Sequence, residues 1–203
     1  SVLTPFRNGE ADILIGTQMI VKGHDFPNVT LVAALAADMS LYAGDYRSSE
    51  RTFELLMQAS GRAGRAEKAG EVVIQTYNPE EYSIQAVAGQ DAEYFYENEL
   101  AFRRLMKYPP YSQMAAILIL SEEENEAKTL SEKLAENIHS VCGDAVTLIG
   151  PSKAGLSRAK DRYRYVLYVK SMDEEAMACV REIAEEANRR VVNQKTCSVQ
   201  YDR

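Results

Sequence analysis

Two short segments of the sequence combine glycine with side chains that bind phosphate. The first is G-T-Q-M-I-V-K-G-H-D at residues 16–25. Its glycines let a backbone approach a phosphate closely, because glycine has no Cβ atom. Its hydroxyl, amide and carboxylate side chains can hydrogen-bond a phosphate or a ribose hydroxyl. A polar loop with a turn at Asp25 explains the segment equally well. The candidate residues are Gly16, Thr17, Gln18, Gly23 and Asp25.

The second segment is Q-A-S-G-R-A-G-R at residues 58–65. Arg62 and Arg65 are three positions apart, so a continued helical turn would place both guanidinium groups on one side. A guanidinium binds two phosphate oxygens at once and can stabilise the charge of a phosphoryl group in transfer. Gln58 can orient the attacking water or contact the nucleotide. The alternative is a solvated helix C-terminus with glycine as its cap.

One dense basic stretch lies further along the chain, between residues 153 and 164. The net charge is −7, which argues against a chain that binds nucleic acid over its whole surface but permits a local basic patch. We expect this stretch to contact phosphates. Tyr163 and Tyr165 lie within it and would either stack on bases or belong to the core. Its basic residues are Lys153, Arg158, Lys160, Arg162 and Arg164.

Composition excludes several classes of protein. The chain has 203 residues, of which 46% are hydrophobic, so it can bury a core. We find neither an apolar run of membrane-spanning length nor a signal segment, and expect no membrane partner. Three scattered cysteines and two histidines do not form a disulfide framework or a metal site. We therefore expect a cytoplasmic globular protein with reduced thiols and no metal of its own.

The first half of the chain alternates strand and helix, which is typical of an α/β fold. Apolar runs predict buried strands at 11–16, 29–36 and 71–77. The first phosphate-binding segment would follow directly from the first strand, at the sheet edge where ligands bind in open α/β sheets. A helix is predicted from about residue 46, and a long helical stretch ends before Pro109.

The second half follows the order β-α-β-β-α-β, the ferredoxin-like arrangement of an α+β domain. Ser121 and Glu124 predict a capping box at the start of its first helix, and the basic stretch is predicted to be a loop. Strands are predicted at 113–120, 146–149, 163–170 and 197–201. In the third strand, alternation places Tyr163 and Tyr165 on one face and Arg164, Val166 and Tyr168 on the other. The inward face of the first helix is predicted to be Ala127, Leu130, Leu134, Ile138 and Val141.

Four stretches together closely resemble one family of proteins. The first two are similar to motifs V and VI of superfamily 2 helicases, and all four are similar to the PriA family of bacterial replication-restart helicases, also called primosomal protein N′. They are D-I-L-I-G-T-Q-M-I-V-K-G-H-D-F-P-N-V-T-L-V at 12–32, S-E-R-T-F-E-L-L-M-Q-A-S-G-R-A-G-R at 49–65, E-V-V-I-Q-T-Y-N-P at 71–79 and F-R-R-L-M-K-Y-P-P-Y at 102–111. The resemblance is dense to about residue 111 and looser, though colinear, beyond it.

The resemblance implies a DNA-dependent ATPase that moves 3′ to 5′ and acts at forks, D-loops and single strands. Its partners would be single-strand-binding protein and other primosome proteins. Residues 1–110 would be the C-terminal part of the second RecA-like lobe, of the P-loop NTPase class, and residues 111–203 a DNA-binding domain. Motif V would place Gly16, Thr17 and Gln18 on the DNA, with Gly23 and Asp25 nearer the nucleotide. Motif VI would supply Arg62 and Arg65 as arginine fingers, with Gln58 alongside.

The sequence also departs from that family. It contains no G-x-x-x-x-G-K-[ST] phosphate loop, no paired acids for Mg²⁺ and no cysteine-rich zinc segment. ATP, Mg²⁺ and zinc would therefore belong to a longer parent enzyme, and this chain alone is expected neither to hydrolyse ATP nor to unwind DNA. Two alternatives remain: a module that only binds nucleic acid or a protein, and a ferredoxin-like small-molecule sensor, which would have no use for the paired arginines.

Overall fold

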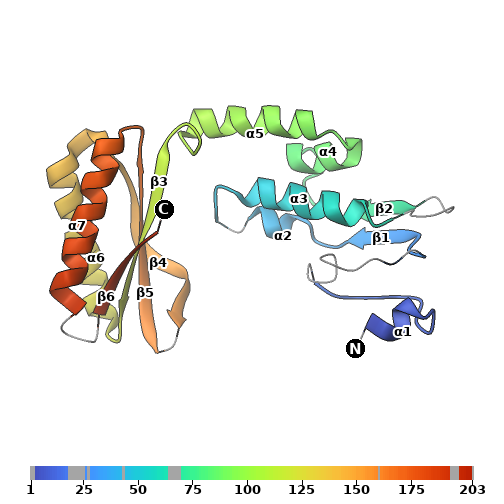
Figure 1. The fold of residues 1–203 in the computed structure, drawn as a ribbon, viewed down its shortest axis with the longest axis horizontal. Helices are drawn as coiled ribbons and strands as arrows, with labels where there is room; N and C mark the ends of the chain where they lie inside the picture. Colours follow the sequence, from blue (N-terminus) through green and yellow to red (C-terminus); the bar gives the residue numbers. More distant parts are fainter. Residues whose placement is uncertain are drawn as a thin grey trace. The chain divides into compact units, whose positions relative to one another are not determined.

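The structure is a computed structural model that describes residues 3–17, 26, 28–42, 44–63, 70–159, 161–192 and 197–202. The fold is mixed α/β, and the chain divides into two compact units, Ser1–Ala101 and Phe102–Arg203 (Figure 1). Helix α5 (Ala92–Met106) contains the point at which the chain passes from the first unit to the second.

The first unit contains a two-stranded parallel sheet. Strands β1 (Leu31–Ala34) and β2 (Glu71–Ile74) pair along their whole length (Figure 1). The connection between them contains helices α2 (Asp38–Leu41) and α3 (Ser48–Ser60). Both strands lie inside the segments predicted from apolar runs, and their parallel pairing is the pattern expected of an α/β unit.

The strand predicted at 11–16 is wrong. After helix α1 (Leu3–Arg7), residues 11–17 form neither helix nor strand. Ile13 and Ile15 are 78% and 88% exposed. A strand of this apolar kind needs both a hydrogen-bonded neighbour and cover for its side chains. Since β1 pairs only with β2 among the described strands, residues 11–17 obtain neither.

Two helices complete the first unit where one long helical stretch was predicted. Helix α4 (Tyr82–Gly89) begins at Glu81, whose carboxylate accepts the backbone N–H groups of the first turn. It ends at Gln90, which is in the left-handed conformation, and α5 follows. The core between these helices and α3 contains Phe53 and Phe95, whose rings stack with centroids 4.1 Å apart.

The second unit has the predicted element order, β-α-β-β-α-β. Its strands are β3 (Gln113–Ser121), β4 (Thr147–Ala159), β5 (Arg162–Ser171) and β6 (Cys197–Asp202). Its helices are α6 (Glu124–Cys142), a short 3-10 turn η2 (Gly143–Ala145) and α7 (Glu174–Val192). The strands form one antiparallel sheet in the order β4-β5-β3-β6, with both long helices on one side (Figure 1).

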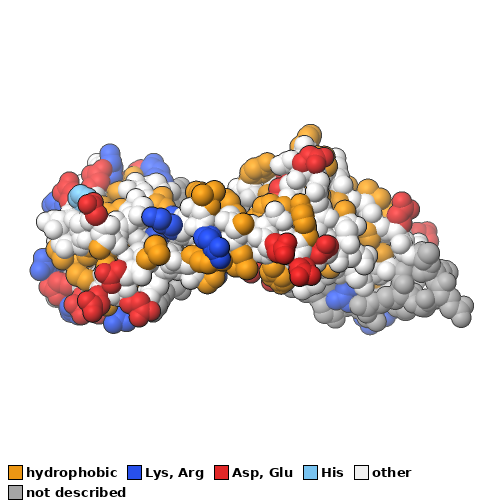
Figure 2. Space-filling model, turned by 90° about the horizontal axis from the view of Figure 1, so that it is seen from above, with side chains coloured by type: hydrophobic (Ala, Val, Ile, Leu, Met, Phe, Trp, Pro, Cys, Tyr) orange, Lys and Arg blue, Asp and Glu red, His pale blue; other side chains and the backbone are white. Residues whose placement is uncertain are grey.

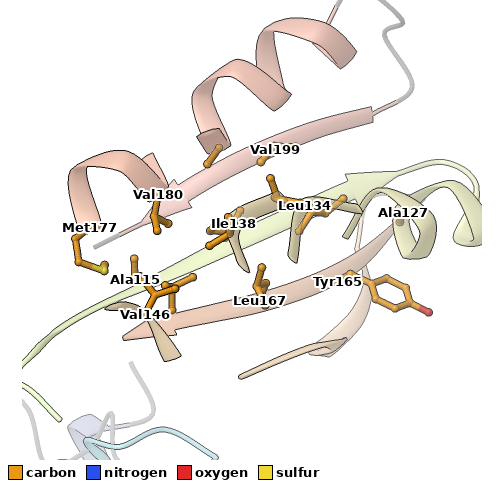
Figure 3. Packing of buried hydrophobic residues seen from close by; sticks show 14 of the residues in the cluster. Ala115, Ala127, Leu134, Ile138, Val146, Tyr165, Leu167, Met177, Val180 and Val199 are labelled. Carbon is orange, nitrogen blue, oxygen red and sulfur yellow. The ribbon is translucent and has the colours of Figure 1, made fainter. Parts of the chain in front are cut away.

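The core of the second unit lies between that sheet and its two helices. Figure 3 shows side chains of β3 and β5, such as Leu167, pointing toward side chains of α6 and α7, such as Ile138 and Val180. All three are fully buried. The alternation of β5 predicted this face correctly, since Tyr165, Leu167 and Val169 are all buried in it.

Two local predictions on α6 are wrong. The predicted capping box does not form: the Ser121 hydroxyl donates to Glu126 rather than pairing with the start of the helix at Glu124, and the hydroxyl oxygen accepts the backbone N–H of Glu123. Val141, predicted to face inward, is 58% exposed. The strand β3 extends through Ser121, so that this side chain is buried in the sheet and is not free to cap.

The burial of Leu167 predicts a large effect on stability. Leu167→Ala should lower the free energy of unfolding of the second unit by about 2–5 kcal/mol, since it opens a cavity in a closed core. Leu156→Ala is the matched control, because Leu156 is 61% exposed, and should change stability by less than about 0.5 kcal/mol. Urea unfolding combined with hydrogen exchange of the β3 and β5 amides measures both. Equal effects of the two variants would contradict this account of the core.

Candidate functional site

Helix α3 presents the second phosphate-binding segment. Phe53, Leu56 and Ala59 on one side of the helix are buried in the core, whereas Gln58 is exposed. The helical turn continues past the end of α3, since the N–H of Arg62 donates to the carbonyl of Ala59 at 3.0 Å. Arg62 is therefore four positions after Gln58 on a continuous turn, which places the two residues on the same side.

A set of buried polar contacts fixes the start of α3. The hydroxyl of Thr52, fully buried on α3, lies within hydrogen-bond distance of the Ser40 hydroxyl, at 2.9 Å, and of the carbonyl of Ser48, at 2.8 Å. Ser40 belongs to α2, so this contact joins the two helices. Hydrogen bonds within a buried network are strong and directional. The orientation of α3 is thus determined by side chains well ahead of Gln58.

Asp38 connects the same region to the sheet. Its buried carboxylate accepts the hydroxyl of Thr76 at 2.6 Å and the backbone N–H of Tyr77 at 2.9 Å, both just after the end of β2. The hydroxyl first, and then the backbone N–H, lower the pKa of Asp38. Sequence reasoning did not select this residue, because a single aspartate after a strand carries no recognisable spacing.

Gly61 stands beside Arg62 although the backbone does not require a glycine there. Its φ of −67° is in the right-handed helical region, which every residue adopts. A Cβ atom at this position would meet the carbonyl oxygen of Met57 at 3.5 Å, an ordinary contact. Local folding therefore does not explain this glycine.

The other residues predicted around the nucleotide are described only in part. Gly16 and Thr17 are exposed and lie in the irregular segment 11–17. Because that segment is not a strand, they do not follow the end of a buried strand as predicted. Four further candidates lie outside the residues that the structure describes: Gln18, Gly23, Asp25 and Arg65.

The basic stretch is a β-hairpin, which corrects the predicted loop. Strand β4 continues through it to Ala159, pairs with Arg162 of β5 and turns at Asp161, whose φ is +59°. Two irregularities in the pairing, after Ile149 and after Lys153, bend β4. The alternation of apolar and polar residues is weak in this part of the sequence. Pairing with β5 is what makes it a strand.

The cations of this hairpin have partners that leave much of their charge available. Lys153 pairs with Glu124 of α6 at 2.5 Å, and this carboxylate raises the pKa of the lysine. Arg158 contacts Asp161 at 3.5 Å and lies over the ring of Tyr163. Such exposed ion pairs stabilise a protein little, so a phosphate can compete for either cation.

The remaining hairpin residues lie along β5, apart from Lys160, which is outside the described residues. Arg164 donates to the neutral carbonyl of Leu156 at 3.3 Å, a contact that does not cancel its charge. Arg162 is half-buried. Figure 2 shows basic and acidic side chains interspersed over the second unit on the face in view.

Burial decides between the two interpretations of the hairpin tyrosines. Tyr165 is buried in the core of the second unit (Figure 3). Tyr163 is half-buried and packs against the same core. Both rings are used in packing, so the alternative in which they belong to the core is confirmed.

No metal centre or membrane segment is found in the described part of the chain. It contains no group of three or more histidine, cysteine or acidic side chains that could hold a metal ion. No described helix is long and apolar enough to cross a membrane. The three cysteines are free thiols, and burial raises the pKa of both Cys142 and Cys197 to about 11.

Comparison with known proteins assigns a class to each half of the chain. The family described as helicase conserved C-terminal domain matches residues 1–67, which include α3 and the whole of the second phosphate-binding segment. The family described as primosomal protein N C-terminal domain matches residues 104–203, which include the β4–β5 hairpin. The two matches together define part of a helicase joined to a primosomal domain.

Curated relatives identify the family. The chain is 46% identical over 201 residues to replication restart protein PriA of Bacillus subtilis, a match that covers 99% of this chain and 25% of that protein. Its identity to the proteins of the same name is 42% in Synechocystis and 35% in Chlamydia muridarum, each over 84% of this chain and 20% and 23% of theirs. The chain belongs to the PriA family, and it spans about a quarter of the length of these relatives.

The lowered pKa of Asp38 predicts a pH dependence. Because the folded state holds the charged form, its contribution to stability is present above the ordinary carboxyl pKa of 3.8 and is lost as the pH falls through the lowered value. Thr76→Val removes the first donor and should lower the stability of the first unit at neutral pH. The difference from the wild type should become smaller in acid, where only the contact of the hydroxyl with the backbone N–H of Asn78 is lost.

Urea unfolding at several values between about pH 3 and pH 7, combined with hydrogen exchange of the α3 amides, measures this difference. The control is Ser49→Ala, at a half-buried position of the same helix, where the hydroxyl makes a longer contact with Glu81, at 3.5 Å. A difference for Thr76→Val that stays constant over the whole range would contradict the assignment.

Proposed function

We propose that this chain is the C-terminal part of an ATP-dependent 3′–5′ DNA helicase of superfamily 2 that restarts stalled replication forks. The observation that carries the proposal is the match of residues 1–67 to the helicase C-terminal family, since those residues include the arginine segment at the end of α3. The longer protein would act in the bacterial cytoplasm on forks, D-loops and single strands, together with single-strand-binding protein and other primosome proteins.

We further propose a division at residues 1–110 and 111–203. The first part would be the end of a RecA-like lobe, which the parallel β1–β2 pair with its connecting helices supports. The second would be a ferredoxin-like DNA-binding domain. This is supported by the strand order β4-β5-β3-β6 of its fully antiparallel sheet. Counted within the domain, the order is 2-3-1-4, which fits a ferredoxin-like sheet.

In the ATP site of the longer protein, this chain would supply the arginine side. Arg62 and Arg65 would contact the γ-phosphoryl group and stabilise the charge that develops on it during transfer. Gln58, on the same side of the turn as Arg62, would hold the attacking water or the nucleotide. Gly23 and Asp25 would lie nearer the nucleotide, and Gly16, Thr17 and Gln18 nearer the DNA.

The other components of that ATP site would come from elsewhere in the longer protein. The sequence has no phosphate loop, and the described residues contain no acidic cluster that fits Mg²⁺. ATP and Mg²⁺ would therefore bind between this part and a second lobe, and zinc would bind outside this sequence.

The second part would hold DNA phosphates through the β4–β5 hairpin. The contributing side chains would be Lys153, Arg158, Lys160, Arg162 and Arg164. A module that only binds nucleic acid or a protein is the second candidate function. It is favoured by the same hairpin, because the hairpin needs no nucleotide to act.

The proposed division of the ATP site predicts that this chain alone does not turn over ATP. The arginine side stabilises charge but does not hold the phosphates or Mg²⁺. Phosphate release with a purified chain should stay at the background rate, with and without single-stranded DNA. Steady turnover that is lost in the Arg65→Ala variant would contradict the prediction.

The hairpin charges predict salt-dependent DNA binding. Four or five phosphate contacts give a slope of about −3 to −4.5 in a plot of log affinity against log salt concentration. Fluorescence anisotropy with a labelled fork at several salt concentrations measures this slope. Replacing Arg158, Lys160, Arg162 and Arg164 by alanine should weaken binding and flatten the slope, and an affinity that does not depend on salt would contradict the assignment.

The ion pair between Lys153 and Glu124 provides a further variant for the fork-binding measurement. Glu124→Gln removes the competing carboxylate and should strengthen fork binding by about two- to five-fold, since such pairs stabilise by up to about 1 kcal/mol. Glu132→Gln is the matched control: it changes the net charge of the chain equally and breaks a pair on the same helix with Lys128. Equal gains from both variants would show a general charge effect rather than contact through Lys153.

A further inference from the structure

The four-stranded sheet of the second unit has one face that its helices do not cover. α6 and α7 both pack on the other face, against Leu167 and Val169 of β5 (Figures 1 and 3). Successive side chains of a strand point to opposite faces. Tyr168, between these two residues, and Val166, just before them, therefore belong to the open face, as does Arg164 two residues before Val166.

The pairing register places an aromatic ring in the middle of that face. Tyr168 pairs with Ile149 of β4 on one side and with Ala116 of β3 on the other, and directly paired residues share a face. The neighbouring row contains Val166 and Leu118. Tyr168 is half-buried and Ile149 is 40% exposed. Tyr168 and Ile149 thus form a partly exposed apolar surface, beside which Leu118 is half-buried and Val166 is buried.

The charges on this face are distributed unevenly, with cations on β5 and one acidic residue on β6. Arg164 is four residues from Tyr168 on β5, about 13 Å away, and Arg162 is two residues further. Asp202 lies in the row of Tyr168 but on β6, at the opposite edge. A polyanion is therefore attracted along β5 and the hairpin and repelled at β6.

At the C-terminal end of β5, the open face is in contact with the segment that precedes β3. The ammonium group of Lys170 donates to the carbonyl of Met106 at 3.0 Å and lies over the ring of Tyr108. The segment that leads into β3 thus covers the open face beyond Tyr168. The residues of β5 that remain partly exposed on this face are Arg162, Arg164 and Tyr168, whereas Val166 between Arg164 and Tyr168 is buried.

We infer that this open face binds unpaired bases of single-stranded DNA, one of which stacks on Tyr168 while the adjoining phosphates lie along Arg164 and Arg162. The inference rests on the proposed DNA contact of the hairpin and adds to it a site for bases. Base stacking on an aromatic ring beside cations that bind the backbone is how proteins hold single strands without reading their sequence. It also moves base stacking from Tyr163 and Tyr165, which are in the core, to the opposite face.

The sequence contains no tryptophan, which allows a direct test. The Tyr168→Trp variant of the full 203-residue chain carries a single indole at the proposed stacking position. Titration with oligothymidine should quench its fluorescence in parallel with the rise in anisotropy of a labelled strand. An abasic oligonucleotide of the same length keeps the phosphates but has no bases. It should bind through the hairpin and leave the fluorescence unchanged.

Affinity variants separate stacking from charge. Tyr168→Leu should weaken binding of oligothymidine by about five- to a hundred-fold, and should change binding of the abasic strand by less than two-fold. Tyr168→Phe keeps the ring and should bind as the wild type does, which also shows that the position tolerates substitution. Arg181 lies on α7, which packs on the opposite face of the sheet, so Arg181→Gln is the control for the loss of one positive charge.

The possible outcomes distinguish this inference from the proposed function. Salt-dependent binding without quenching, or equal quenching by the abasic strand, overturns stacking on this face and leaves phosphate contact by the hairpin in place. Absence of any binding overturns both. Equal losses for Tyr168→Leu and Tyr168→Phe overturn the role of the ring and indicate a requirement for the hydroxyl, as in contact with a protein partner.

Discussion

The arrangement of the second unit follows from two facts: side chains alternate along each strand, and the helices cover only one face of the sheet. Because side chains alternate, the burial of Leu167 and Val169 under α6 and α7 fixes the face of every other residue of β5. A shift of one residue would exchange the tyrosines of the core with Tyr168 and Arg164. The same core that makes the sheet stable therefore determines which aromatic and which cationic side chains lie on the face that the helices do not cover.

The first unit has a comparable constraint at the start of α3. Thr52 and Asp38 anchor the helix and its neighbours to the end of β2 through buried hydrogen bonds. Arg62 follows at the other end of the same helix, in a turn that continues past its last residue. Packing and buried polar contacts thus hold this helix at one end, and the turn that contains Arg62 lies at the other.

The two halves of the chain were predictable to different degrees. The second unit repeats clear periods, two for strands and 3.6 for helices, so its element order and the division of the β5 residues between two faces were predicted correctly. The strand predicted at 11–16 was wrong because an apolar run forms a strand only where a neighbour pairs with it and covers it. The loop predicted from the basic residues was wrong for the converse reason, since β5 provides a pairing partner for a segment with little strand pattern of its own.

The sequence by itself determined the family and the types of residue available: an arginine segment with glycines, a basic stretch and tyrosines in alternation. These follow from local order along the chain, which chemistry and spacing express directly. Only the tertiary structure decided that Tyr165 is in the core while Tyr168 is not, that Lys153 shares its charge with Glu124, and that Gly61 is not required by its backbone. Each of these depends on atoms distant in sequence or on a backbone angle, and composition and periodicity contain neither.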